Sequence, residues 1–406
     1  MLGLASTVSS GSPVESLYSI TLDGTNDKIA LGPSDSMILD GFSGITLSLW
    51  IKTSTAGGYL FSNLRQSDGS NFSLRFHANS ALTGSPLRLE GLILNGSGTL
   101  IKPMTTADVA DGAWHHIVLT GKASEQVLYI DGAVAAGDDA TTTGAFGMDA
   151  SSDVAHIGSF GTGSFFDGQI DEVSIWNSAL NLASVQAIYS RGSQHDLTSG
   201  LSIGTGPLVA YYRMGNGTFD DKANGVVHDQ HASGFGSEMV TNGHFDTNVS
   251  GWTQHLDNAS SITQGTYGGR SGVARVVIST TEATDRFRQD ITWEKGCLYY
   301  FSVDVYLLSG KFRIDGVDAD IEGAGPGSGS DVLGPITYDA AVDDRWRTLT
   351  GYAQGQRTGG TDQVWIRSSG IAAEFYVDNF SIKKLNGFPG LTSNVDVPTA
   401  FSSDTP

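Results

Sequence analysis

Residues 168–176 contain an aspartate, Asp171, whose place in a predicted β-strand would bury its charge. Their alternating pattern predicts a β-strand in which Asp171 shares one face with Val173 and Ile175. We expect that face to pack against the core. An unpaired buried charge is very costly, so Asp171 needs a cation or several N–H donors.

A second aspartate poses the same problem near the end of the chain. Residues 375–382 also alternate, and the pattern places Asp378 on one face with Phe380 and Ile382. Each of the two strands comes late in a long β-rich region. We therefore expect each to be the closing strand of a β-sandwich, with its aspartate near the strand that opens the domain.

The composition favours β-structure throughout. The chain has 406 residues, enough for two or three domains, with 53 glycines and only 16% charged residues. Runs that favour helix are scarce, while Thr, Ser, Val, Ile and Gly dominate. The exception is residues 178–189, whose spacing predicts one short helix that ends near Gly192.

Charge and cysteine content exclude several classes of function. The net charge of −20 argues against a nucleic-acid partner, because phosphate binding needs clustered Lys and Arg. It suits a soluble surface or divalent cations. Cys297 is the only cysteine, so no intrachain disulfide forms. No stretch is apolar enough to insert in a membrane, and the first residues lack the pattern of a secretory signal.

Pattern and composition divide the chain into five parts. Residues 1–16 are an N-terminal arm, and 17–195 are a first β-rich domain. Residues 196–236 are a Gly-, Asp- and Asn-rich connector, and 237–385 are a second β-rich domain. Residues 386–406 are a C-terminal tail rich in Pro, Ser, Thr and Asp. Its composition predicts disorder in isolation, so we expect neighbouring chains of an assembly to hold it.

The motifs of residues 17–195 resemble the laminin-G/concanavalin A-like jelly-roll family. They are, in order, Asp-Gly-Thr-Asn-Asp at 23–27, Leu-Ser-Leu-Trp-Ile-Lys at 47–52, Asp-Gly-Ala-Trp-His-His-Ile-Val-Leu-Thr at 111–120, Leu-Tyr-Ile-Asp-Gly at 128–132 and Phe-Asp-Gly-Gln-Ile-Asp-Glu-Val-Ser-Ile-Trp at 166–176. The resemblance implies a two-sheet antiparallel sandwich used for glycan or protein binding. Family members often carry calcium.

Residues 238–385 resemble carbohydrate-binding modules of the galactose-binding-like jelly-roll type. The matching motifs are Asn-Gly-x-Phe-Asp at 242–246 followed by Gly-Trp at 251–252, and the closing Tyr-Val-Asp-Asn-Phe-Ser-Ile at 376–382. We therefore expect an all-β fold: two antiparallel jelly-roll β-sandwiches joined by an irregular connector.

The first resemblance also allows a test for enzyme activity. Glycoside hydrolases of the concanavalin A-like fold share a strand motif Glu-x-Asp-x-x-Glu, and a retaining mechanism needs both Glu about 5 Å apart. With Asp171 at the central Asp, Gln169 and Ser174 stand at the two Glu positions. Neither side chain can act as nucleophile or general acid there. We therefore expect no catalytic residues and no enzyme.

The two aspartates and the family resemblance together predict a structural calcium ion in each sandwich, where the first and last strands meet. Calcium takes six to eight oxygens, mixing carboxylates with turn carbonyls. The alternative is that backbone N–H groups alone satisfy each aspartate. The predicted ligands are Asp23, Asp27 and Asp171 in the first sandwich, and Asn242, Gly243, Asp246 and Asp378 in the second.

Aromatic residues of the second domain are candidates for stacking on sugars. A pyranose offers an apolar C–H face, so glycan sites commonly combine one or two aromatic rings with amides and carboxylates. Core packing is the alternative for each, because a sequence does not tell which rings are exposed. The candidates are Trp252, Tyr267, Trp293, Trp346, Tyr352 and Trp365.

Lectin-type domains without disulfides or a visible export signal fit a bacteriophage particle, which assembles in the cytosol and is released by lysis. The leading hypothesis is a non-catalytic virion protein of fibre or decoration type, extracellular after lysis. Its partners would be glycans or cell-surface polysaccharide, other virion proteins and copies of itself in a homo-oligomer. The alternatives are a secreted bacterial adhesin or polysaccharide-binding protein, and a non-catalytic subunit of a glycan-degrading enzyme.

Overall fold

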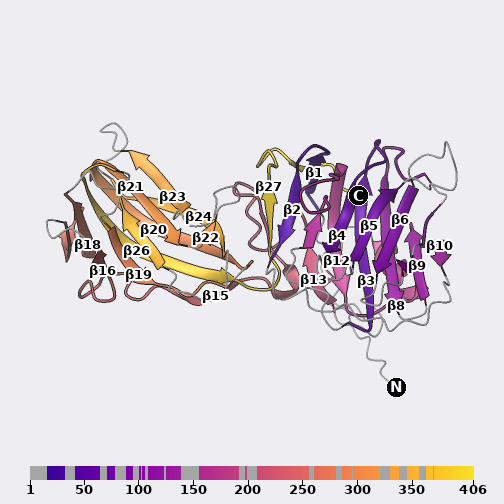
Figure 1. Ribbon diagram of the computed structural model, residues 1–406, viewed down its shortest axis with the longest axis horizontal. Helices are drawn as coiled ribbons and strands as arrows, with labels where there is room; N and C mark the ends of the chain where they lie inside the picture. The colour runs from indigo at the N-terminus through magenta and orange to yellow at the C-terminus, as the bar shows by residue number, and fades with distance from the viewer. Residues whose placement is uncertain are drawn as a thin grey trace, which may run out of the picture.

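A computed structural model shows an almost entirely β-structured protein, with two antiparallel sandwiches side by side along its long axis (Figure 1). No helix in the described part of the chain is long and apolar enough to cross a membrane. The structure describes residues 16–32, 42–64, 71–77, 88–94, 100–101, 103–105, 108–122, 125–138, 155–191, 197–198, 208–255, 260–279, 286–294, 296–317, 319–320, 330–337, 345–355, 363–368 and 370–406.

The first sandwich consists of two eight-stranded antiparallel sheets. One sheet has the order β10-β9-β8-β3-β12-β1-β28, and β13 also pairs with β12; the other has the order β14-β27-β2-β11-β4-β5-β6-β7. The strands are β1 (Ser19–Asp23), β2 (Lys28–Leu31), β3 (Gly44–Lys52), β4 (Tyr59–Leu64), β5 (Asn71–His77), β6 (Arg88–Leu94), β7 (Leu100–Ile101), β8 (Trp114–Lys122), β9 (Glu125–Ile130), β10 (Ala133–Asp138), β11 (Ala155–Ile157), β12 (Asp167–Trp176), β13 (Leu208–Tyr212), β14 (Val226–Val227), β27 (Gly390–Ser393) and β28 (Phe401–Ser402).

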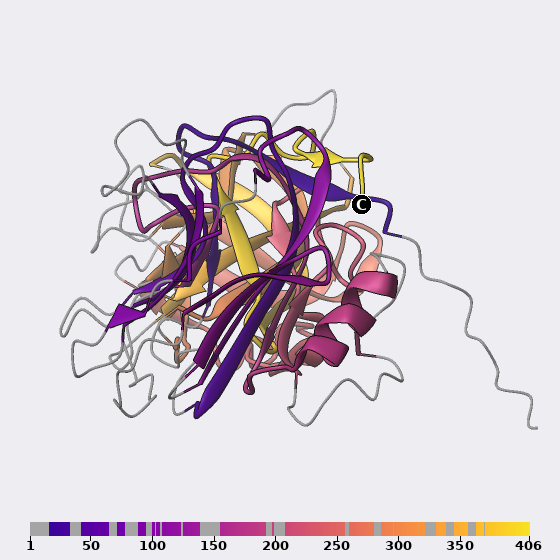
Figure 2. The same cartoon turned by 90° about the vertical axis from the view of Figure 1, so that its right-hand side faces the viewer.

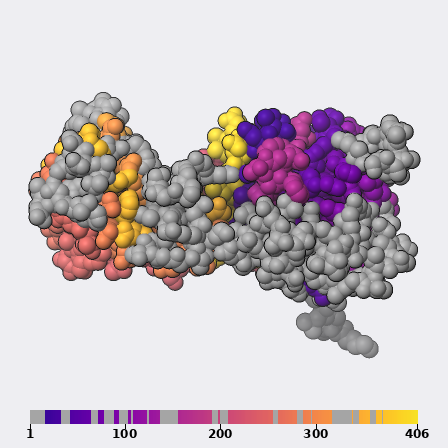
Figure 3. Space-filling model, viewed as in Figure 1, coloured from indigo at the N-terminus to yellow at the C-terminus, as the bar shows by residue number. Residues whose placement is uncertain are grey.

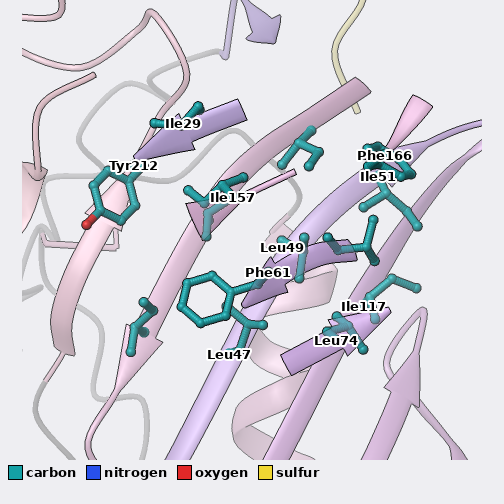
Figure 4. Close-up of a cluster of buried hydrophobic side chains, with 14 of the residues drawn as sticks. Ile29, Leu47, Leu49, Ile51, Phe61, Leu74, Ile117, Ile157, Phe166 and Tyr212 are labelled. Carbon is teal, nitrogen blue, oxygen red and sulfur yellow. The ribbon is translucent and has the colours of Figure 1, made fainter. Parts of the chain in front are cut away.

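Alternating apolar residues of both sheets fill the space between them. Leu47, Leu49 and Ile51 of β3 face Phe61 of β4 and Leu74 of β5, and all five are fully buried (Figure 4). The single α-helix among the described residues, α1 (Leu182–Arg191), packs on the outside of the first sandwich (Figure 2). The predicted short helix is therefore confirmed.

The C-terminal segment differs from its prediction. Residues 386–406 do not remain without structure: β27 pairs with β2 and β14, and β28 pairs with β1 of the first sandwich. Phe401 is buried in that sandwich's core. Asp404 bonds to Lys52 at 2.5 Å and to Nε1 of Trp114 at 3.1 Å. Figure 3 shows the yellow atoms of the C-terminal segment beside indigo atoms from the first strands of the chain.

Edge pairing gives the physical reason for this difference. The composition of residues 386–406 indicates only that this segment cannot form a hydrophobic core of its own. A strand added to an existing sheet needs only main-chain hydrogen bonds and a few buried side chains. The same chain, and not a neighbouring one, supplies the sheet that orders the tail.

The second sandwich has a seven-stranded and a five-stranded antiparallel sheet. The first has the order β17-β18-β26-β20-β24-β22, with β15 also paired to β26, and the second has the order β16-β19-β25-β21-β23. A 3-10 helix, η2 (Gln230–Ala232), precedes it. The strands are β15 (Phe235–Glu238), β16 (Thr253–His255), β17 (Ser261–Tyr267), β18 (Arg270–Ile278), β19 (Arg286–Asp290), β20 (Leu298–Ser309), β21 (Lys311–Val317), β22 (Ala319–Asp320), β23 (Ser330–Thr337), β24 (Arg347–Gly355), β25 (Gln363–Arg367) and β26 (Ala373–Leu385).

Candidate functional site

A β-bulge in β12 changes the predicted face of Asp171. Glu172 has a positive φ of 49°, and the pairing of β12 with β3 shifts between Asp171 and Ser174. Such an extra residue reverses the alternation of the strand. Ile170, not Asp171, therefore shares the core face with Val173 and Ile175, and the predicted face of Asp171 is wrong.

The carboxylate of Asp171 is nevertheless fully buried and has partners of its own. Ser16 donates its hydroxyl to one oxygen at 2.9 Å, and the backbone N–H of Glu172 donates to the other at 2.8 Å. Burial, and then the charge of Glu172, raise the pKa of Asp171 well above its usual value. These contacts are of the kind that satisfies a buried aspartate without a cation.

Glu172 is buried beside Asp171 and carries the second charge of this bulge. Nε of Arg213 donates to one of its oxygens at 3.2 Å, and the hydroxyl of Tyr211 donates to the other. Arg213 and Glu172 are only 4% and 5% exposed. We call this group of Ser16, Asp171, Glu172, Tyr211 and Arg213 the sealed bulge, because a substrate cannot reach its carboxylates.

The sealed bulge lies apart from the other predicted calcium ligands of this sandwich. Asp23 pairs with Asp167 across β1 and β12, and Asp171 lies four residues further along β12, roughly 13 Å away. Asp27 instead accepts the backbone N–H of Asp23 at 3.0 Å. Asp23, Asp27 and Asp396 line a cavity of about 500 Å³. The predicted set of Asp23, Asp27 and Asp171 therefore does not fit one ion.

The same bulge recurs in β26 of the second sandwich. Asn379 has a positive φ of 50°, and the pairing with β20 shifts opposite it, between Ser302 and Asp304. Val377, Phe380 and Ile382 belong to the core, so Asp378 does not share the core face with Phe380 and Ile382 as predicted. The backbone N–H of Asn379 donates to Asp378 at 2.8 Å, as at Asp171.

Polar side chains surround this second bulge at the surface. Arg270 lies 2.7 Å from Asp304 and 3.5 Å from Asp378, and Nδ2 of Asn379 donates to Asp304 at 2.9 Å. Burial tends to raise the pKa of Asp304, but hydrogen bonds from Thr348, Asn379 and Arg270 hold that pKa below its usual value. We call these five residues, Arg270, Asp304, Thr348, Asp378 and Asn379, the open bulge.

The predicted calcium ligands of the second sandwich lie in two segments that are hydrogen-bonded to each other, but their polar groups bond to other residues. Gly243 accepts the N–H of Phe380 at 2.9 Å, so the opening turn does meet the closing strand. Asn242, however, donates its amide to Asn248 and Ser250, and the carbonyl of Asp246 accepts from Gln264. Arg270 already supplies a positive charge beside Asp378, at 3.5 Å.

Neither predicted set therefore fits a calcium ion in the described geometry. Among the residues that the structure describes, no group of three or more His, Cys, Asp or Glu is arranged to hold a metal. Calcium binding stays a prediction from the sequence, and the geometry of these residues argues against it at both bulges.

The six candidate aromatic residues fall in four different places. Trp252 and Trp293 are 7% and 0% exposed and belong to the core of the second sandwich, so they cannot stack on a sugar. Trp365 lies on the five-stranded sheet with Arg286 over its ring at 3.9 Å. Tyr352 lines a cavity at the junction of the two sandwiches. Tyr267 and Trp346 contribute to a row of rings on the seven-stranded sheet.

This row joins four half-buried rings from β17, β20, β26 and the residue just before β24. Tyr267 and Tyr376 are nearly parallel at 5.1 Å, Tyr376 contacts Tyr306 at 5.5 Å, and Tyr306 contacts Trp346 at 5.8 Å between ring centres. We call Tyr267, Tyr306, Trp346 and Tyr376 the aromatic row. Tyr306 and Tyr376 were missing from the prediction.

Strand alternation could have identified the two missing tyrosines. Val305 and Leu307 flank Tyr306, and Phe375 and Val377 flank Tyr376, and all four flanking residues are buried in the core. In an unbulged strand, a tyrosine between two core residues points to the outer face of the sheet. Two such tyrosines on the paired strands β20 and β26 predict a contact between them.

Arg270 links the aromatic row to the open bulge. Its guanidinium lies 4.2 Å from the ring of Trp346, and Nε1 of Trp346 donates to the carbonyl of Gly268 at 2.8 Å. Gly268 and Gly269 both have positive φ, as the tight turn between β17 and β18 requires. That turn therefore places Tyr267 and Arg270 beside Trp346.

Comparison with known families covers the first sandwich. Residues 23–186 match the family described as the concanavalin A-like lectin/glucanases superfamily, laminin-G type. The first sandwich is thus similar to that superfamily, as its motifs predicted. A search of curated proteins found no match.

Solved structures show remote similarity only. A putative carbohydrate binding protein from Bacteroides ovatus is 18% identical, with 52% of this chain and 54% of that chain covered and a TM-score of 0.36. The CBM22-1 xylan-binding domain from Paenibacillus barcinonensis Xyn10C is 17% identical, with 38% of this chain and 96% of that chain covered and a TM-score of 0.29. Domains LG4-5 of mouse laminin α1 are 12% identical, with 95% of this chain and 84% of that chain covered and a TM-score of 0.32.

Proposed function

We propose that this chain is a non-catalytic glycan-binding protein whose second sandwich holds sugar on the aromatic row. The contact of four half-buried rings on the outer face of a sheet is the observation that carries this proposal. Rings on the outer face contribute little to the core between the sheets. They offer apolar surface on which the C–H face of a pyranose can stack.

The open bulge supports the same function because it supplies polar groups next to the rings. Arg270 contacts both Trp346 and Asp304, and Thr348 and Asn379 donate to Asp304. Sugar hydroxyls need donors and acceptors of this kind, held in fixed positions. A surface with rings and polar groups side by side fits a glycan better than a purely apolar partner.

The carboxylates argue for binding without hydrolysis. Asp171 and Glu172 are closed off in the sealed bulge, and Gln169 and Ser174 stand where a glycosidase needs its acid and nucleophile. In the open bulge, the lowered pKa of Asp304 makes it a poor proton donor near neutral pH. We therefore expect no new reducing ends when the protein is incubated with the glycan that it binds.

A glycan array followed by calorimetry tests the proposal. Replacement of Tyr306 or Trp346 by Ala removes a ring from the row, and we expect at least a tenfold loss of affinity, about 1.4 kcal/mol. Ile371→Ala, an exposed apolar residue of the same sandwich, is the control and leaves binding unchanged. Equal affinity of wild type, Tyr306→Ala and Trp346→Ala for every glycan bound would refute the aromatic row as the site.

We propose display on a bacteriophage particle as the setting for this binding. Two lectin-type sandwiches in one chain support it, because weak sites become useful when several copies engage one surface. The chain should then be found in purified particles with other virion proteins, as a homo-oligomer larger than the 42.7 kDa monomer in light scattering. A secreted adhesin would instead be found free or on the producing cell.

A further inference from the structure

A cavity of about 580 Å³ lies at the junction of the two sandwiches, where three separate parts of the chain meet. This volume falls within the range of about 300–1,000 Å³ that is usual for small-molecule sites. The junction lies between β27 of the first sandwich and the ends of β15, β20 and β24 of the second (Figure 1). We call it the junction pocket; it is lined by Phe219, Asp220, Asp221, Lys222, Ala223, Phe235, Tyr300, Tyr352 and Pro398.

The walls of the junction pocket are a chain of four aromatic rings. Phe219 contacts Phe235 at 5.4 Å, Phe235 contacts Tyr300 at 5.4 Å, and Tyr300 contacts Tyr352 at 5.2 Å. Phe219 is 49% exposed, so the end of this chain of rings is open to solvent. The other three rings are partly buried and pack on one side against Val226, Leu298 and Leu385. The stacking surface is therefore Phe219 together with the parts of the other rings that line the cavity.

The polar groups of the pocket are held rigidly by the connector. Asp221 accepts from Nδ2 of Asn224 at 2.8 Å and from the hydroxyl of Tyr352, whose pKa is raised by burial and then by the charge of Asp221. Asp220 accepts three backbone N–H groups. The ammonium of Lys222 lies 3.9 Å from the ring of Tyr18. The lining thus contains two carboxylates and one ammonium. Burial raises the pKa of Asp220 to about 6, so this group is still mostly ionised at pH 7, and the net charge of the lining is negative.

The junction pocket and the aromatic row lie on the same outer face of the seven-stranded sheet. Tyr300 pairs with Tyr352 across β20 and β24. Six residues away from each of them, Tyr306 of β20 contacts Trp346, which directly precedes β24. Residues that differ by an even number share a face, and six residues span roughly 20 Å. An aromatic pair therefore stands at each end of this strand pair, with the polar residue Asp304 between them.

We infer that the junction pocket is a second sugar subsite, which takes one or two uncharged pyranose residues. This inference rests on the proposed function, since it assigns a further subsite of the same glycan-binding face. The angled rings would pack on sugar C–H groups, and the fixed polar groups would contact hydroxyls. The two carboxylates repel uronic and other acidic sugars, so anionic glycans bind here weakly.

Titrations with short probes test the subsite separately from the aromatic row. The probes are four neutral disaccharides, cellobiose, maltose, lactose and diacetylchitobiose, together with the anionic digalacturonate, each observed by saturation-transfer NMR. We expect at least one neutral disaccharide to bind wild type, with a tenfold loss of affinity in Phe219→Ala and in Tyr300→Ala. Digalacturonate binds at least tenfold more weakly. Ile371→Ala is the control, and thermal melts check that every variant folds.

Tyr306→Ala separates the failure of this inference from that of the proposed function. If disaccharide signals disappear in Tyr306→Ala but persist in Phe219→Ala and Tyr300→Ala, the junction pocket is overturned and the aromatic row stands. The same holds if no disaccharide binds at about 10 mM while a polysaccharide binds through the row. If no glycan of any length binds, both proposals fail. Equal binding of digalacturonate overturns the predicted preference for uncharged sugars.

Discussion

The two sandwiches carry the same bulge in their closing strands and use it differently. In each, an aspartate accepts the N–H of the next residue at 2.8 Å, and that next residue has a positive φ near 50°. Asp171 and Glu172 of the sealed bulge are 0% and 5% exposed, whereas in the open bulge Asp378 is 8% exposed but the next residue, Asn379, is exposed and donates to Asp304. The local backbone chemistry is therefore shared, and the surroundings differ.

What packs over each bulge accounts for that difference. β13 pairs with β12 and brings Tyr211 and Arg213 onto Glu172, and Ser16 completes the cover. Next to the open bulge lie instead Arg270 and the rings of the aromatic row. A bulge that aims polar groups out of a sheet can thus serve stability when it is covered and binding when it is left open.

Removal of one arginine from each bulge should show the largest contrast. Arg213→Met leaves Glu172 buried without its guanidinium, and we expect a loss of about 3–5 kcal/mol in the free energy of unfolding. Arg270→Met removes a partly exposed ion pair, and we expect a loss of less than about 1 kcal/mol. Urea unfolding measures both variants. Losses of similar size would show that the two bulges have equivalent surroundings.

The first sandwich also takes part of its core from the far end of the chain. Phe401 is 7% exposed within the first core, so Phe401→Ala should cost about 3 kcal/mol through lost burial and a cavity. Ile371→Ala, at an exposed position of the second sandwich, should change stability by less than about 0.5 kcal/mol. A near-zero effect of Phe401→Ala would mean that the C-terminal segment contributes nothing to the first core.

Both bulges show how far strand patterns can be read. Alternation identified the strands that contain Asp171 and Asp378, and it marked both aspartates as unusual. It placed both on the wrong face, because a pattern with period two assumes that no residue leaves the regular backbone. Glu172 and Asn379 do leave it, and nothing in the types of these residues requires a positive φ.

The aromatic residues and the C-terminal segment show two further things that the sequence does not reveal, namely side-chain exposure and long-range strand pairing. A ring type does not reveal its exposure, so Trp293 in the core and Trp346 in the row were equal candidates. The flanking core residues of Tyr306 carried usable information, because alternation holds there. The tail became ordered through edges of the first sandwich, and a pairing between residues so distant in the chain leaves no local pattern.

A buried histidine gives the first sandwich its own dependence on pH. His116 is fully buried against Trp50 and Ser48, and burial lowers its pKa to about 3 from 6.5. The unfolded chain therefore binds a proton below pH 6.5 that the folded chain does not. This contribution to stability is complete above pH 6.5 and is lost as pH falls toward 3, by about 2 kcal/mol between pH 7 and pH 5.

Unfolding at a series of pH values tests this dependence. We expect the decline between pH 7 and pH 5 to be smaller in His116→Gln than in wild type by about 2 kcal/mol. The rest of the decline includes the contribution of His228, whose pKa burial lowers to about 4. His244→Gln, at an exposed histidine beside the open bulge, is the control and keeps the decline. If the pH profiles of His116→Gln and wild type are parallel, then His116 is accessible to protons in the folded state.

Removal of calcium should change thermal stability less than any of the substitutions above. It tests whether the aspartate of either bulge holds an ion. A saturated structural site would add roughly 3–4 kcal/mol to stability. Asp171 is satisfied by Ser16 and the N–H of Glu172, and Arg270 lies beside Asp378, so neither aspartate needs an ion. We therefore expect EGTA and 1 mM calcium to give nearly the same thermal melt. If calcium instead raises the melt by several degrees and mass spectrometry finds bound metal, Asp27→Asn and Asp378→Asn identify the sandwich that binds it.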